Sequence, residues 1–463
     1  MKRATEAILT EGPIGKTLAR LTFPMILGLL SMTLFNLVDT FFIGQLGKDP
    51  LAAMGFTFPV IMMVHSIALG LGIGASSVVS RAIGRRDVRD VRRLSTHALV
   101  LSVAIVALFI ILGELTIDPL FRLLGAPHRL LPLIREYMQI WYVGALFVVV
   151  PVVGNNLIRA TGDTKTPGLI MAFCAALNAG LDPLLIFGLG PFPALGIAGG
   201  ALATVLARAI GLLLSLHILV RRDRLVGIDA LEPGRLLESW KALLAIGVPA
   251  TLTQLVQPVS MGVITRMVAG FGTAAVAGFG VATRVEMLVL LVVFALSGVL
   301  VPFAGQNWGA GRTYRIARSM LGSYAFSMVW GVLMFLLFLV IGRDLAGLFN
   351  RDPGVIHAAG SYFDIIFPSL GFYGILFLSI SVLNAMHSPL WATALSLTRM
   401  IGLYVPLAWL GMMLFGLKGL FLGGTLANVL TGALAAGLVY RRIRRESAMG
   451  IADPLRPSTG TVS

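Results

Sequence analysis

Two aspartates stand inside long apolar stretches of this 463-residue sequence. Asp39 lies within residues 18–43, and Asp182 lies within "NAGLDPLL", four residues after Asn178. An ionised carboxylate costs roughly 2.5–3.5 kcal/mol or more at the centre of a membrane helix, so such a residue usually marks an ion or proton pathway. The spacing places Asn178 and Asp182 on one helix face, about one turn apart.

Three further polar side chains can join them, namely Tyr137, Asn155 and Thr204. Carboxylate, amide and hydroxyl oxygens are the hard ligands that a small cation prefers. The same groups can instead bind and release protons, and the residue types leave both options open. Two structural alternatives also stand: amides and hydroxyls hydrogen-bond between membrane helices, and a buried aspartate can pair with an arginine.

The second half of the sequence carries a different set of polar residues. The seventh apolar stretch contains Gln254 and Gln257 but no carboxylate, and the eighth contains Arg284 and Glu286 in "ATRVEML". Arg284 and Glu286 are two residues apart, so they point to different sides of a helix. We expect this pair to be mainly structural, with substrate contact by these four residues as the second option.

The composition indicates which elements must hold these residues. Apolar residues make up 57% of the chain and charged residues 12%, whereas an ordinary soluble domain is about 25% charged. A bilayer core of ~30 Å needs about 20 apolar residues per helix. The sequence therefore predicts an all-α polytopic membrane protein with twelve transmembrane helices. The expected spans are 18–43, 51–79, 94–117, 132–159, 166–189, 195–220, 240–269, 275–303, 318–341, 356–385, 391–415 and 418–440.

Basic residues predict the topology of these spans. The net charge of +15 is arranged by loop, as in "RAIGRRDVRDVRR" after the second span and "RRIRR" after the twelfth. By the positive-inside rule both termini are cytoplasmic, and we expect no nucleic-acid partner. The first span lacks a convincing cleavage site, so we expect it to stay in the mature protein. Cys174 is the only cysteine, which excludes an intrachain disulfide or a Cys-based metal site.

The sequence repeats itself after 225 residues. Several residues coincide under this shift: Pro24 with Pro249, Gly47 with Gly272, Gly55 with Gly280, and Gly84 with Gly309. A six-span unit returns the chain to the side where it began, so the two copies have the same orientation, as in many transporters. We expect an N-lobe at residues 1–224, a cytoplasmic linker at 225–239, a C-lobe at 240–445 and a disordered cytoplasmic tail at 446–463.

Several segments together resemble the multidrug and toxic compound extrusion (MATE) family, and more narrowly its prokaryotic DinF-like branch. They are "NLVDTFFIG", "NNLIRATGDTKTP", "NAGLDPLLIF", "GIAGGALAT" and "GQNWGAGR". The resemblance implies two pseudo-symmetric six-helix lobes around a central cavity, and drug efflux driven by H⁺ or Na⁺.

The resemblance also implies which residues form the site. The DinF-like cation site maps onto Asp39, Asn178, Asp182 and Thr204, with Tyr137 and Asn155 nearby. The other prokaryotic branch has a carboxylate in the seventh span, which is replaced here by Gln257. That departure argues against an ion site in the C-lobe.

These observations predict a secondary active antiporter rather than an enzyme, in the cytoplasmic membrane of a bacterium or archaeon. H⁺ or Na⁺ entry would rearrange the N-lobe, with the first helix bending near Pro24, and release amphipathic, often cationic drugs. We expect no cofactor besides the coupling ion, no metal beyond possible Na⁺ at the four site residues, and a monomer in the lipid bilayer.

Three other functions are weighed against efflux. A flippase for a lipid-linked or polysaccharide precursor should show several arginines in mid-helix, and the sequence has few. An intramembrane aspartyl protease predicts Gly-x-Gly-Asp, whereas the chain has "AGLD". A passive channel would differ from an antiporter in its response to an ion gradient.

Overall fold

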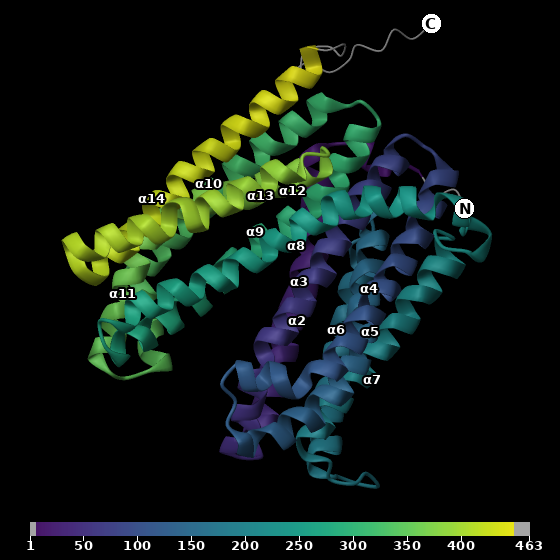
Figure 1. The fold of residues 1–463 in the computed structure, drawn as a ribbon. Coiled ribbons are helices and arrows are strands. Elements are labelled where there is room, and N and C mark those ends of the chain that lie inside the picture. Colours follow the sequence, from purple (N-terminus) through teal and green to yellow (C-terminus); the bar gives the residue numbers. More distant parts are fainter. Residues whose placement is uncertain (1–5, 449–463) are drawn as a thin grey trace, which may run out of the picture. The chain divides into compact units, whose positions relative to one another are not determined.

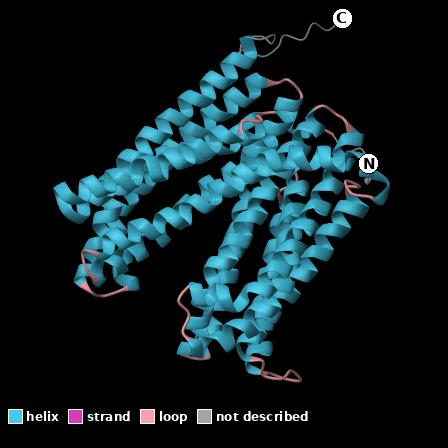
Figure 2. Cartoon of the chain, viewed as in Figure 1, coloured by secondary structure: helices cyan, strands magenta, loops and turns pink. Residues whose placement is uncertain are grey.

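The computed structural model describes residues 6–448, and within this range every regular element is helical (Figures 1 and 2). The first half contains α2 (Ile14–Gln45), α3 (Lys48–Gly84), α4 (Val88–Leu123), α5 (Leu131–Ala160), α6 (Lys165–Phe187) and α7 (Gly196–His217). The second half contains α8 (Leu236–Ala269), α9 (Thr273–Gly309), α10 (Thr313–Phe349), α11 (Pro353–Ile366), α12 (Leu370–Ala385), α13 (Pro389–Leu397) and α14 (Val405–Ala448). Beyond Ala448 the predicted tail lies outside the described residues.

Eleven helical segments of the described chain are long and apolar enough to cross a membrane. Ten coincide with ten expected spans. The last segment, Pro389–Arg445, takes in both the eleventh and the twelfth expected spans. The all-helical membrane class predicted from composition is therefore confirmed.

The segment Pro389–Arg445 contains a sharp break. Phe415 and Gly416 inside α14 are not helical, and Gly416 has φ 60° and ψ −142°. A Cβ on Gly411 would lie 2.1 Å from the carbonyl oxygen of Gly419. Eight residues of a straight helix would span about 12 Å, so the chain must double back here. The positive φ and the close backbone approach both require glycine.

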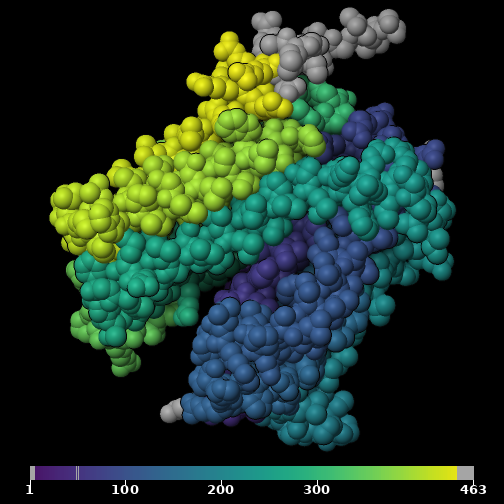
Figure 3. Space-filling view, viewed as in Figure 1, coloured from purple at the N-terminus to yellow at the C-terminus, as the bar shows by residue number. Residues whose placement is uncertain are grey.

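Large apolar side chains cover the outer surfaces of helices in both halves. Leu115 is 75% exposed, Leu213 66% and Val340 77%. Figure 3 shows the chain in space-filling form, coloured by residue number. A surface of this kind would promote aggregation in water but is the natural partner of lipid chains. The protein is accordingly a multi-pass membrane protein.

The chain divides into two compact units. The first comprises Met1–Ile8 and Phe23–Thr251, and the second Leu9–Thr22 and Leu252–Ser463. The division therefore falls inside α2 and inside α8. The predicted linker 225–239 lies wholly within the first unit, where Arg89 contacts Glu232 at 3.1 Å and the Trp240 indole donates to the backbone oxygen of His97 at 3.2 Å.

Glycines bring the helices of the first unit close together. A Cβ on Gly70 of α3 would lie 2.6 Å from the backbone nitrogen of Thr251, and one on Gly74 would lie 2.8 Å from the oxygen of Leu243. Both contacts are to the part of α8 that belongs to this unit. Membrane helices approach closely through small residues because lipid supplies little hydrophobic drive between them. The glycines of "LGLGIGASS", residues 69–77, thus serve helix packing.

The second unit holds a short segment from the beginning of the chain. The backbone nitrogen of Leu9 donates to Gln306 at 3.0 Å, and Asn307 donates to the Leu9 oxygen at 3.1 Å. Arg315 donates to the backbone oxygens of Glu11 and Gly12. Gln306 and Asn307 belong to "GQNWGAGR", so this segment of the sequence anchors the backbone that leads into α2.

Candidate functional site

Asp39 lies on α2 where that helix meets α7. A Cβ built on Gly200 of α7 would lie 3.0 Å from Ile43 Cδ1 and 3.5 Å from Asp39 Oδ1. Gly200 has no side chain, so α7 approaches the carboxylate closely. Thr204 follows Gly200 by one helical turn and presents its hydroxyl on the same face.

A second contact fixes the register of these two helices. The guanidinium carbon of Arg208 lies 4.5 Å from the centre of the Phe35 ring. Phe35 and Asp39 are four residues apart on α2, as Thr204 and Arg208 are on α7. The helices therefore run antiparallel with Asp39 opposite Thr204.

α6 supplies two fully buried groups to the same region. Asn178 and Asp182 are both 0% exposed, and the Asn178 amide donates to Asp182 Oδ1 at 3.1 Å. α6 runs through Pro183 to Phe187. Asp182 is close enough to Asp39 for their charges to interact. Tyr137 of α5, also buried, is within electrostatic reach of both carboxylates.

Four oxygens of this group are buried without a hydrogen-bond partner among the described residues. They are Asp39 Oδ1, Asn178 Oδ1, Asp182 Oδ2 and Thr204 Oγ1. Leaving a buried polar atom unpaired costs about 1–3 kcal/mol, more for a charged group. No ion pair with arginine reaches either aspartate in the described chain, so the structural alternative for them is not realised. The oxygens fit the ligands of a small hard cation or the acceptors of protons.

Two of the predicted supporting residues lie apart from this oxygen group. Asn155 Oδ1 accepts a hydrogen bond from Ser215 of α7 at 2.9 Å, which is the interhelical role considered as an alternative. Pro24 precedes Asp39 by 15 residues, or about 22 Å along α2. Its carbonyl oxygen lies 2.6 Å from the point where a Cβ on Gly168 of α6 would be.

Of the second-unit residues predicted as substrate contacts, Gln257 and Glu286 reach one polar network around Arg399. Gln254 is half-buried, Gln257 is exposed and donates to the Tyr373 hydroxyl at 3.5 Å, and Arg284 is exposed. Glu286 accepts a hydrogen bond from the Tyr362 hydroxyl. Its neighbour Arg284 points elsewhere, as their spacing predicts.

Sequence reasoning missed the centre of this second network, Arg399. Its guanidinium donates to Asn428 at 2.9 Å, stacks 3.6 Å from the Tyr373 ring centre and interacts electrostatically with Glu286. Asn428 in turn donates to Ser369 at 2.9 Å. Arg399 lies in a π-helical turn, Thr398–Tyr404, a feature frequent at functional sites. A buried arginine in an apolar span is the signal that could have found it.

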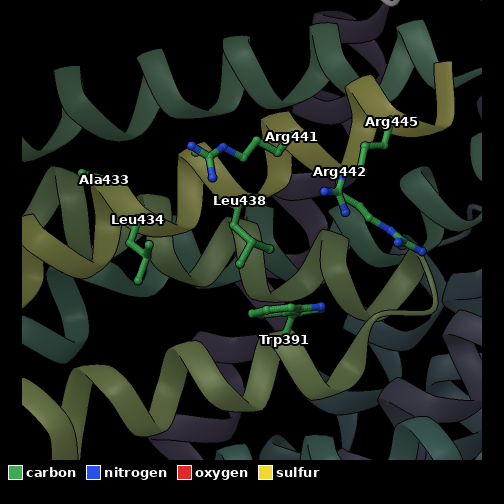
Figure 4. Close-up of a pocket in the computed structure, with 8 residues that line it drawn as sticks. Trp391, Ala433, Leu434, Leu438, Arg441, Arg442 and Arg445 are labelled. Atoms are coloured by element: carbon green, nitrogen blue, oxygen red, sulfur yellow. The ribbon is translucent and has the colours of Figure 1, made fainter. Parts of the chain in front are cut away.

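A surface pocket of about 440 Å³ lies elsewhere in the second unit (Figure 4). Leu434 and Leu438 of α14 point toward the Trp391 ring of α13 across it. Its lining is Trp391, Ala433, Leu434, Gly437, Leu438, Arg441, Arg442 and Arg445. None of the predicted site residues lines it. Apolar walls beside arginines suit a surface near lipid headgroups better than an ion site.

The family model named MatE matches the chain twice, at residues 24–184 and 249–410. The two matches begin 225 residues apart (249 − 24 = 225), which is the shift predicted from the repeated residues. The chain belongs to the MATE transporter family. Both the repeat and the resemblance to the MATE family are thereby confirmed.

Relatives of this MATE transporter differ in the cargo that their names state. The FAD transporter of Shewanella oneidensis is 39% identical over 451 residues, 97% of this chain and 98% of that protein. The probable multidrug resistance protein YpnP of Bacillus subtilis is 29% identical over 433 residues, 93% of this chain and 96% of that protein. The crystal structure of the Vibrio cholerae MATE transporter VcmN in the bent form is similar with a TM-score of 0.89 and 34% identity, covering 94% of this chain and 98% of that one.

Proposed function

We propose that this MATE transporter is a secondary active efflux antiporter, which exports small amphipathic molecules in exchange for H⁺ or Na⁺ by alternating access. The observation that carries the proposal is the group of four unpaired, buried oxygens on Asp39, Asn178, Asp182 and Thr204. Binding a cation or protons there offsets the cost of burying them. An ion gradient can do work only if the ion binds one conformation better than another, and such a site provides that difference.

In the proposed cycle, ion binding draws α2, α6 and α7 together around the oxygens and α2 bends near Pro24. The contact of the Pro24 carbonyl with Gly168 supports this hinge, because no side chain at position 168 obstructs the backbone. VcmN, whose structure is similar, has been solved in a form named bent. Coupling then requires that ion and exported molecule have opposite preferences for the two conformations.

The same proposal includes the finer architecture expected from the sequence. The segment Pro389–Arg445 would cross the membrane twice, once before and once after the break at Phe415 and Gly416. The protein would then have twelve spans in a DinF-like arrangement. Both termini would then be cytoplasmic, with lobes at residues 1–224 and 240–445 in a bacterial or archaeal inner membrane.

Two substrate classes are candidates. Amphipathic and often cationic drugs are one, as the multidrug name of YpnP suggests, and ionised carboxylates would attract them. A flavin dinucleotide is the other, because the FAD transporter is 39% identical and aligns along nearly the whole chain. FAD is anionic, so the two classes demand opposite charges of their binding site.

Transport by purified protein in proteoliposomes tests the proposal. We expect efflux of a fluorescent cationic dye or of FAD when a pH gradient or a Na⁺ gradient is imposed, and which gradient works identifies the coupling ion. Asp39→Asn should abolish gradient-driven efflux, whereas Arg266→Gln, at an exposed position of the second unit, should not. Efflux that persists in Asp39→Asn, or that ignores both gradients in the wild type, would contradict an antiport mechanism.

A further inference from the structure

Arg208 lies near the middle of α7, one helical turn from Thr204. Twelve residues separate it from Gly196 and nine from His217, or about 18 and 14 Å along the helix. A charged side chain so far from both ends of a span is rare and usually functional. The oxygens of the cation site do not explain its presence.

The surroundings of Arg208 orient the guanidinium without neutralising it. The Phe35 ring stacks at 4.5 Å, and the Nε atom is buried without a hydrogen-bond partner among the described residues. The side chain as a whole is half-buried, so part of it stays accessible. No carboxylate of the described chain forms an ion pair with it, although Asp39 stands only one turn further along α2 than Phe35.

A second nitrogen-bearing side chain stands beside it. His65, near the middle of α3, is half-buried and close enough to Arg208 for their charges to interact. No described side chain hydrogen-bonds to a ring nitrogen of His65, but the Ile61 backbone one turn earlier on α3 interacts with the ring. Arg208 also interacts with the thiol of Cys174 on α6. The buried Nε–H of Arg208 therefore has no acceptor among the described residues.

We propose that Arg208 forms an anion subsite inside the first unit, which binds a phosphate group of the exported molecule. The guanidinium presents several N–H donors in a planar fork that matches phosphate, and stacking on Phe35 holds the fork in one orientation. This inference rests on the proposed export function and selects the anionic candidate, a dinucleotide with a pyrophosphate. Asp39 and Asp182 then serve the coupling ion, and Arg208 serves the cargo.

The test measures binding, not transport. The full chain is placed in nanodiscs of phosphatidylcholine, and FAD binding is followed by flavin fluorescence, with riboflavin as the ligand that lacks phosphate. Losing a hydrogen bond to a charged group weakens binding by at least about tenfold. We expect Arg208→Gln to weaken FAD binding by this factor and to leave riboflavin binding unchanged. Arg208→Lys, which keeps the charge but not the fork, should fall between, and Arg266→Gln should match the wild type.

Three outcomes would overturn the subsite. One is equal FAD affinity in the wild type and Arg208→Gln; another is parallel loss of FAD and riboflavin in both Arg208 variants, which would mark a structural role. In the third outcome, phosphatidylglycerol in the nanodisc displaces FAD from the wild type but not from Arg208→Gln. The subsite would then hold a lipid headgroup. FAD binding needs no ion gradient. The binding result can therefore support the subsite even if gradient-driven transport fails in proteoliposomes, and gradient-driven transport can succeed even if Arg208 does not bind phosphate.

Discussion

The two halves of this transporter share a repeated scaffold but differ at corresponding buried polar positions. In the first unit, Thr204 follows "GGALA" and its hydroxyl is unpaired; in the second, Asn428 follows "GGTLA" and both ends of its amide are hydrogen-bonded. Asp39 corresponds to Ile264 under the 225-residue shift, and aligning Pro183 with Pro406 sets Asp182 against Val405. Unpaired oxygens are available for an exchangeable ion, whereas paired ones specify packing.

The largest effect is expected from a substitution in the oxygen group of the first unit. Asp182→Asn removes a carboxylate from the oxygen group, and we expect gradient-driven transport to fall by about a hundredfold or more, because a site missing one charge binds the ion too weakly to couple it. Glu286→Gln is the matched change in the second unit, and most transport should remain. Initial rates in proteoliposomes, normalised to folded protein, measure both. Equal losses in the two variants would remove the functional distinction between the units.

The second prediction tests whether the paired network is structural. Arg399→Gln leaves Asn428 and the Glu286 charge without their partner, and breaking such a buried group costs roughly 3–5 kcal/mol. The thermal midpoint of the purified protein should fall by several degrees, while transport per folded molecule persists. Arg266→Gln is the control and should melt like the wild type. A variant that melts normally but no longer transports would instead place Arg399 in the transport site.

The third prediction concerns the proposed bend of α2 near Pro24 in the first unit. Gly168→Ala places a methyl group 2.6 Å from the Pro24 carbonyl oxygen, and overpacking of this kind costs about 1–3 kcal/mol. We expect slower transport with an unchanged dependence on the coupling ion. Gly180→Ala on the same helix meets open space and should leave the transport rate unaltered. If both variants transport at the wild-type rate, α2 does not bend at Pro24.

The smallest effect is expected at the α5–α6 connection. Burial by itself raises the pKa of the Asp163 carboxyl, but hydrogen bonds from Thr166 and Arg222 outweigh it and hold the pKa below its usual value. Because the folded pKa is lowered, the carboxylate stabilises the fold above the unfolded pKa and loses that effect as pH falls through the folded pKa. Asp163→Asn should therefore cost about 1 kcal/mol at neutral pH.

Thermal unfolding across pH measures this effect. The difference between Asp163→Asn and the wild type should disappear in strong acid, where both side chains are neutral. A destabilisation that is constant with pH would show that the Asp163 charge is not its cause. Thr166→Val is the matched variant, because it removes one of the stabilising hydrogen bonds and leaves the charge in place.

Much of the fold follows from the sequence alone. Long apolar stretches, sparse charge and the 225-residue shift determine helices that cross a bilayer and a duplicated scaffold, because a backbone in lipid must satisfy its own hydrogen bonds. Charge in such a stretch singles out Asp39 and Asp182, since it is costly there. The boundaries of the compact units were not readable in the same way, because they fall inside α2 and α8, where composition does not change.

What only the tertiary structure decided is which polar groups find partners. Residue type alone placed Asn155 and Thr204 on equal terms, but packing pairs Asn155 with Ser215 and leaves the Thr204 hydroxyl free for the oxygen group. It also gave no sign that Arg208 would meet Phe35, or that Arg399 would find Asn428. Residue type determines what a side chain can bond, but the antiparallel register of helices far apart in the chain determines whether an acceptor stands within about 3 Å.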